Sequence, residues 1–281
     1  MVRSLRPRPL DVVSFIHTSM EDPSLPVARA GMEIFPTPMD ELMSHLSSSK
    51  HRAIAFEGNS GRTTPSHYEI GESSATHFFN LLPSVARTHL RGRTCHFLDD
   101  DPRLAALNTA GYFAKEWLGT PEYIHKQFSA LIQILPESHS HPDANHMDKM
   151  LDAFAAYGEI IARDRTKTSR DEIESANCVL RSLAYYERAR SLKVTALCVG
   201  GAHGEDLEAL DYCNHVPLPS SEKLIPLYPK NPIDDVEYRM GSFSNLFPLM
   251  RQLWVAAGFE GEQLDAHKLR IDSYIRRNPA S

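Results

Sequence analysis

The stretch that most constrains the fold lies late in the chain, at residues 192–207. Residues 194–199 form a short, uncharged apolar run with β-branched members, which is typical of a strand buried on both faces of a parallel sheet. Gly200 and Gly201 follow at once, and His203 comes two residues later. Ligands of open α/β sheets bind at the carboxyl ends of the strands, so this pattern predicts a titratable imidazole at a binding edge. A tight turn that merely exposes His203 is the competing interpretation, and this stretch alone does not separate the two.

Other short apolar runs end in the same way. Candidate strands near residues 12–17 and 52–57 end on His17 and Glu57, and a weaker candidate runs into Asp99. Because parallel strands bring their carboxyl ends to one edge, we expect these side chains to converge with the histidine of the late strand. The alternative for each residue alone is that it meets solvent at a strand end, where it contributes little to the core.

Helical periodicity fills most of the remaining chain. It predicts helices near residues 38–46, 77–91, 121–135, 147–161, 170–190, 243–257 and 262–277. Strands alternate with helices at the start, helices dominate the middle, and a strand-to-helix unit comes late, which favours one α/β domain. We expect a mostly parallel central sheet flanked by helices over residues 11–281. A disordered lead-in would occupy residues 1–10, and a helical insertion or cap would lie at about 103–165.

The overall composition narrows the class of protein. The formal net charge of −6 argues against a nucleic-acid-binding protein, which is usually basic. No apolar run approaches the roughly 18 residues of a membrane span, and the first ten residues lack the apolar core of a secretory signal. The four cysteines form no C-x-x-C pair, which suits a reducing compartment. We therefore expect a cytoplasmic-type protein that binds neither nucleic acid nor membrane.

The predicted edge of the sheet has the residue types that hydrolytic chemistry needs. A histidine with a pKa near neutrality, oriented by a carboxylate, is the usual apparatus for taking a proton from water. Two histidines and carboxylates could instead hold a divalent metal ion that activates the water. The sequence leaves the metal requirement open. Tyr185, on a helical stripe, is predicted to pack in the core or cap.

Four short blocks, in a fixed order over nearly all of residues 11–215, resemble a known superfamily. They are Phe15-Ile16-His17-Thr18, Ala55-Phe56-Glu57-Gly58, Ser169-Arg170-Asp171-Glu172-Ile173 and Val199-Gly200-Gly201-Ala202-His203. In this order they resemble the superfamily that includes erythromycin esterases, the ChaN haem-binding lipoproteins and the TraB/TIKI metalloproteases. The first block departs from the pattern, because Ser14 replaces a glycine and Phe15 replaces the glutamate of the esterase-like members.

The resemblance implies a shared pocket for His17, Glu57, Arg170 and His203. His203 or His17 would be the base that activates water, and Glu57 would be its carboxylate partner. Arg170 would hold a carboxylate or phosphate of the substrate, for which its planar guanidinium is suited. Independently of the resemblance, the strand-end position of Asp99 makes it a further candidate for binding substrate. From the residues alone, the alternative for Arg170 is a salt bridge within the first turn of its own helix.

The expected function is therefore that of a hydrolase-like protein acting on an ester, amide or phosphate-bearing small molecule, or on a peptide. Some members of the superfamily are effectors that bacteria secrete into the cytoplasm of host cells. The alternative is accordingly a non-catalytic effector or binding protein that retains the fold and acts through contacts with host proteins. Haem binding, as in the ChaN group, is disfavoured because the sequence singles out no apolar patch with an axial ligand.

Overall fold

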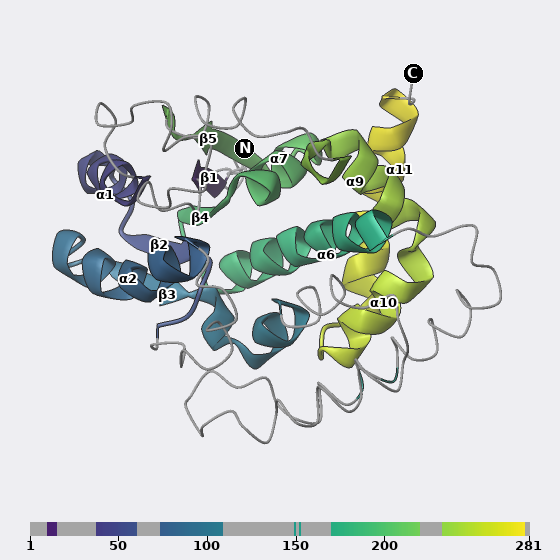
Figure 1. The fold of residues 1–281 in the computed structure, drawn as a ribbon, viewed down its shortest axis with the longest axis horizontal. Coiled ribbons are helices and arrows are strands. Elements are labelled where there is room, and N and C mark those ends of the chain that lie inside the picture. The colour runs from purple at the N-terminus through teal and green to yellow at the C-terminus, as the bar shows by residue number, and fades with distance from the viewer. Residues whose placement is uncertain are drawn as a thin grey trace, which may run out of the picture.

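The computed structural model describes residues 10–15, 38–60, 74–108, 149, 152, 170–219 and 232–278, without the side chains of residues 74–81 and 170. Its centre is a parallel sheet flanked by helices (Figure 1). The strands are β1 (Leu10–Phe15), β2 (Ala53–Phe56), β3 (Thr94–Phe97), β4 (Ala196–Gly200) and β5 (Cys213–Pro217), in the order β3-β2-β4-β1-β5. The pairings that connect these five strands are all parallel. The predicted α/β fold with a parallel central sheet is confirmed.

Helices cover both faces of the sheet. They are α1 (Pro38–Ser48), α2 (Ser74–His89), α6 (Arg170–Ser191), α7 (Gly201–Ala209), α9 (Val236–Asn245), α10 (Phe247–Ala256) and α11 (Gly261–Arg277), with short 3-10 turns η4 (Leu98–Asp100) and η6 (Pro232–Asp234). Figure 1 shows α1 and α2 together on one side, α6 across the middle, and α9, α10 and α11 grouped at the other end. The single helix predicted near 243–257 is instead α9 and α10, which meet at Leu246.

The strands are apolar on both sides because each side faces a separate core. Val13 and Ile54 point into a cluster with α1 and α2, whereas Val12 and Leu197 point into a larger cluster with α6 and the C-terminal helices. All five residues of β4 are buried, as the uncharged run in the sequence predicts.

The topology creates a switch point at the carboxyl edge of the sheet. The chain leaves β2 toward β3 at one margin, and it leaves β4 through α7 toward β5 at the other margin, although β2 and β4 are neighbours. Strands whose connections diverge in this way form a switch point, which is where ligands bind in open α/β sheets. The residues that follow β2 and β4 therefore lie at the position where a site is expected.

Several expectations fall at or beyond the limits of the described residues. β1 begins at Leu10 and ends at Phe15, so Leu10 is part of the sheet and not of a lead-in. His17 and residues 1–9 lie outside the described residues, as do the helices predicted near 121–135 and most of that near 147–161. Residues 102–108 are helical, but the rest of the proposed insertion up to 165 is described only at positions 149 and 152. Within the described part of the chain, no helix combines the length and apolar character of a bilayer span.

Candidate active site

Glu57 lies directly after β2 and caps the helix that follows β4. Its Oε2 accepts a hydrogen bond from the Gly200 N–H at 2.8 Å, at the N-terminus of α7. The exposed N–H groups and the positive end of a helix dipole both favour a carboxylate in this position. Gly58 follows with φ of 103°, a backbone conformation that few residues other than glycine adopt, and it turns the chain sharply after Glu57. The glutamate is thus held in place at the switch point, with only 4% of its surface exposed.

His203 lies in the first turn of α7, where it is 5% exposed. The competing interpretation of a tight turn that exposes His203 is wrong, because Gly201 already opens the helix. The ring Nε2 faces Glu57 Oε1 at 3.7 Å, and Nδ1 lies 2.8 Å from Ser182 Oγ on α6. The edge of the ring also packs against Tyr185, with ring centroids 5.3 Å apart and planes at 87°. Contacts from the end of β2 and from two residues of α6 therefore fix the orientation of the imidazole.

Arg181 is the cation beside these two groups. Its Nη2 donates to Glu57 Oε1 at 3.2 Å and to the Tyr185 hydroxyl at 3.3 Å. Burial alone would lower the pKa of Arg181, but Tyr185 and Glu57 raise it, so the guanidinium is charged. Its side chain keeps 25% of its surface exposed at the switch point.

Asp99 completes the polar cluster from the adjoining strand end. Its Oδ2 accepts from the Gly58 N–H at 3.0 Å, and the Tyr185 hydroxyl donates to Oδ1 at 3.3 Å. Burial, followed by the negative charge of Glu57, raises the pKa of Asp99 to about 7. Near neutral pH this carboxyl group is thus protonated for about half of the time, which suits a group that must give up a proton.

This raised pKa predicts that Asp99→Asn stabilises the protein at alkaline pH. The pKa rises from 3.8 to about 7 on folding. Below about pH 4 Asp99 is protonated in both the native and the unfolded state. Between pH 4 and about pH 7 Asp99 is ionised in the unfolded state but keeps its proton in the native state. The wild-type free energy of unfolding therefore falls as pH rises, by at most about 4 kcal/mol in total, and stays low above pH 7.

Asparagine mimics the neutral acid and should remove this fall. Urea unfolding at pH 4 and pH 8 measures the change in stability of each protein. Asp100→Asn is the matched control, since Asp100 is exposed and accepts from the Ser60 N–H at 2.8 Å. We expect the Asp100→Asn curve to parallel the wild type. If Asp99→Asn also loses stability in parallel with the wild type, Asp99 does not carry a raised pKa.

One set of donor atoms has the spacing of a metal site. Ligand atoms of Cys178, His203 and Asp206 lie within 4.8 Å of one another. However, Ser182 Oγ is 2.8 Å from His203 Nδ1 and 2.7 Å from Asp206 Oδ2, so a hydroxyl group already lies between these two ligands. Burial and then Asp206 raise the pKa of the Cys178 thiol to about 12, whereas metal binding needs the thiolate. The group fits a hydrogen-bonded network better than a metal centre.

A second pair could share a divalent metal ion, namely Glu57 Oε1 and His203 Nε2, which are 3.7 Å apart. Arg181 donates to that same glutamate oxygen, and its positive charge would repel a metal cation. The electrostatics at Glu57 therefore favour a site that works without a metal ion.

The structure brings together three of the predicted site residues, Glu57, Asp99 and His203. Arg170 begins α6, eleven residues before Arg181, so its backbone lies about 16 Å further along the helix axis. The guanidinium beside Glu57 is that of Arg181. His17 lies outside the described residues, so its predicted role stays a prediction.

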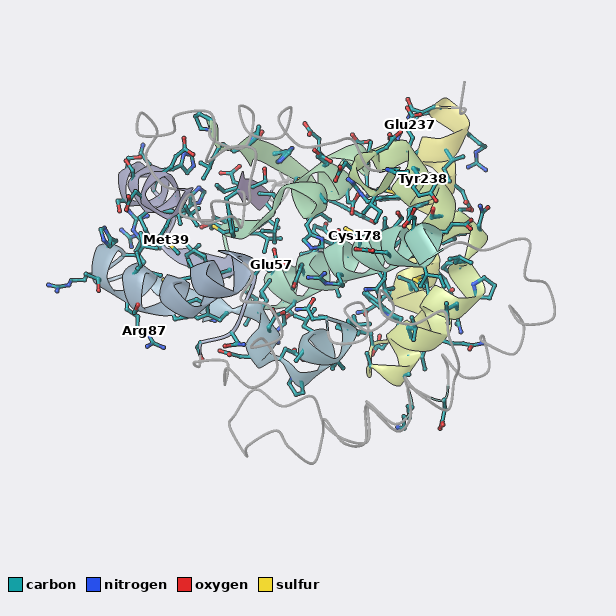
Figure 2. All side chains as sticks on the ribbon, viewed as in Figure 1. Met39, Glu57, Arg87, Cys178, Glu237 and Tyr238 are labelled. Atoms are coloured by element: carbon teal, nitrogen blue, oxygen red, sulfur yellow. The ribbon has the colours of Figure 1, made fainter. Side chains whose placement is uncertain are left out.

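Four residues of α6 that the sequence analysis did not select contribute to this cluster. Cys178, Arg181, Ser182 and Tyr185 recur at the helical spacings of three, four and seven residues, so they share one face. Figure 2 shows Glu57 at the end of β2 beside α6, and Cys178 further along the same helix. Polar residues at this spacing, on a helix predicted to cover a sheet, are the signal that could have identified them.

No protein-family model, curated protein or solved structure matches the chain in comparisons of its sequence and structure. The resemblance to the superfamily of erythromycin esterases, ChaN and TraB/TIKI proteins stays a prediction that rests on the four sequence blocks.

Proposed function

We propose that this protein is a hydrolase-like enzyme in which His203 and Glu57 activate water for attack on an ester, amide or phosphate-bearing substrate. The observation that carries the proposal is the cluster of Glu57, Arg181, Asp99 and His203 at the switch point of the sheet. Burying charged groups costs stability, so their concentration at the edge where ligands bind is better explained by chemistry than by folding.

His203 is the proposed general base. Its Nε2 faces Glu57, and the carboxylate 3.7 Å away stabilises the imidazolium that forms when the ring accepts a proton. A water molecule that donates to both Nε2 and Glu57 Oε1 would direct its lone pairs away from them, toward a bound substrate. Glu57 is itself held by the Gly200 N–H, so the pair is oriented before substrate arrives.

Arg181 and Asp99 supply the remaining roles of a hydrolytic site. The partly exposed guanidinium of Arg181 can stabilise the negative charge that develops on a carbonyl or phosphoryl oxygen. Asp99, whose pKa of about 7 keeps a proton available near neutrality, can protonate the leaving group. Each role is filled by a group that other side chains or backbone amides already hold in place.

The test is hydrolysis of generic chromogenic substrates by the purified full-length chain. Suitable probes are p-nitrophenyl acetate, p-nitrophenyl butyrate, p-nitrophenyl phosphate and an aminoacyl p-nitroanilide, each followed by release of the coloured product. We expect Glu57→Gln to lower kcat on an accepted probe by roughly 100-fold or more, since the imidazolium loses its counter-charge.

The matched control is Glu208→Gln, because Glu208 also contacts a histidine, His215 Nδ1, at 2.7 Å, but on the exposed end of α7. It should hydrolyse the probe at nearly the wild-type rate. A wild-type protein that hydrolyses none of the probes, or a folded Glu57→Gln variant with unchanged kcat, contradicts the proposal and favours a binding protein instead.

A further inference from the structure

We infer that Ser182 and Asp206 are positioning residues that fix His203 as the Nδ1–H tautomer, so that Nε2, facing Glu57, is the nitrogen that accepts a proton. The assignment of the tautomer stands on hydrogen-bond geometry alone. Its consequence for catalysis deepens the proposed function and rests on it.

The hydroxyl of Ser182 has three neighbours within hydrogen-bond distance. They are Asp206 Oδ2 at 2.7 Å, His203 Nδ1 at 2.8 Å and the backbone carbonyl of Cys178 at 2.9 Å. A serine hydroxyl has one proton to donate, and both the carbonyl and an ionised carboxylate can only accept. The proton of Ser182 is therefore used on the oxygen acceptors, and the contact with Nδ1 must be made by a proton on the ring.

Asp206 is paired with a buried arginine. Arg239 Nε donates to Asp206 Oδ1 at 2.8 Å, and both side chains have no exposed surface. The other carboxylate oxygen then needs a donor, and Ser182 supplies it. The result is a chain of hydrogen bonds through Arg239, Asp206, Ser182 and His203. Arg239 and Ser182 both donate to Asp206, and the ring of His203 donates to Ser182.

A neutral imidazole carries one proton, so a ring that donates through Nδ1 accepts through Nε2. In water the opposite tautomer of a neutral histidine is the more populated one, so the protein must supply the preference. Without Ser182, Nδ1–H would lose its acceptor and part of the population would move the proton to Nε2. That tautomer cannot take a proton from water on the side of Glu57.

The measurement is long-range ¹H–¹⁵N NMR of the full-length protein labelled with ¹⁵N-histidine, at pH 8. The His203 signals are identified by their loss in His203→Gln. In the wild type we expect a protonated Nδ1 and an unprotonated Nε2. In Ser182→Ala the Nε2–H form should increase, and kcat on an accepted p-nitrophenyl probe should fall by roughly 10- to 100-fold, part of the contribution of a general base.

Ser14→Ala is the control, because Ser14 Oγ makes an equivalent contact of 2.8 Å with Nε2 of another histidine, His215. It should leave the His203 signals unchanged. A wild-type His203 with its proton on Nε2, or with both nitrogens protonated at pH 8, overturns the inference whether or not Ser182→Ala folds. An Nδ1–H ring in a protein that hydrolyses no probe supports the tautomer assignment but overturns the proposed function.

Discussion

Replacing His203 by glutamine is expected to abolish the catalytic contribution of the proposed base, lowering kcat on an accepted probe by roughly 10²- to 10⁴-fold. Glutamine retains a polar group of similar reach, but its amide cannot take a proton from water near neutral pH. The hydrolysis assay with p-nitrophenyl probes measures the loss, and circular dichroism with thermal melts shows whether the variant is folded. Because His203 is buried and bonded to Ser182, we expect a stability cost of about 1–3 kcal/mol.

Two controls separate lost chemistry from lost structure. His215→Gln removes another hydrogen-bonded histidine, paired with Glu208 on α7, and should remain active. Leu197→Ala truncates a fully buried residue of β4 and should cost about 2–5 kcal/mol of stability while the remaining folded protein keeps its kcat. A folded His203→Gln variant with wild-type kcat would mean that His203 only supports the structure.

Strands with strong apolar runs were predictable from the sequence. β4 is buried along its whole length, so its sequence has almost no polar residues and its end at Gly200 is easy to place. β5 stands out less in the sequence, because Cys213–Pro217 lies at the margin of the sheet and contains Asn214, His215 and Pro217. A marginal strand pairs on one side only, and therefore tolerates the polar residues and proline that weaken a strand prediction.

The strand ends of the site were predictable for the same reason, but the helix that covers them was not. Glu57, Asp99 and His203 follow apolar runs, and a parallel sheet aligns such positions. The contribution of Arg181 and Ser182 depends on which face of α6 lies against the edge of the sheet. Helical periodicity shows which residues share a face, but the partner of each face is set by packing between segments far apart in the chain.

The same helix explains why these strand ends do not meet solvent, which was the alternative considered for each residue alone. Polar residues at a strand end usually meet water, yet Glu57 and His203 are almost completely buried. Ser182 of α6 reaches His203 and Arg181 reaches Glu57, so α6 lies across the edge and covers both. Of the four residues proposed to act in hydrolysis, Asp99 and Arg181 keep partial exposure and are therefore the ones that a ligand would meet first.

The largest loss of stability is expected for Arg239→Met. Arg239 on α9 has no exposed surface and donates to Asp206, to Glu205 and to the backbone carbonyls of Ala202 and Ile233. Methionine fills similar space but leaves the carboxylate of Asp206 buried without a counter-charge, which costs about 3–5 kcal/mol.

Urea unfolding measures this loss, with Arg251→Met as the matched control. Arg251 also pairs with an aspartate, Asp265, at 2.8 Å, but both side chains are exposed to water, so its loss should change stability little. The double variant Arg239→Met with Asp206→Leu removes both buried charges and should recover part of the loss, because no unpaired ion remains.

If Arg239→Met unfolds at the same urea concentration as the wild type, the buried pair does not hold α9 against α7. The orientation of His203 through Asp206 and Ser182 would then need another support. A large loss, partly recovered in the double variant, would show that the charges holding the proposed base in place also hold these two helices together.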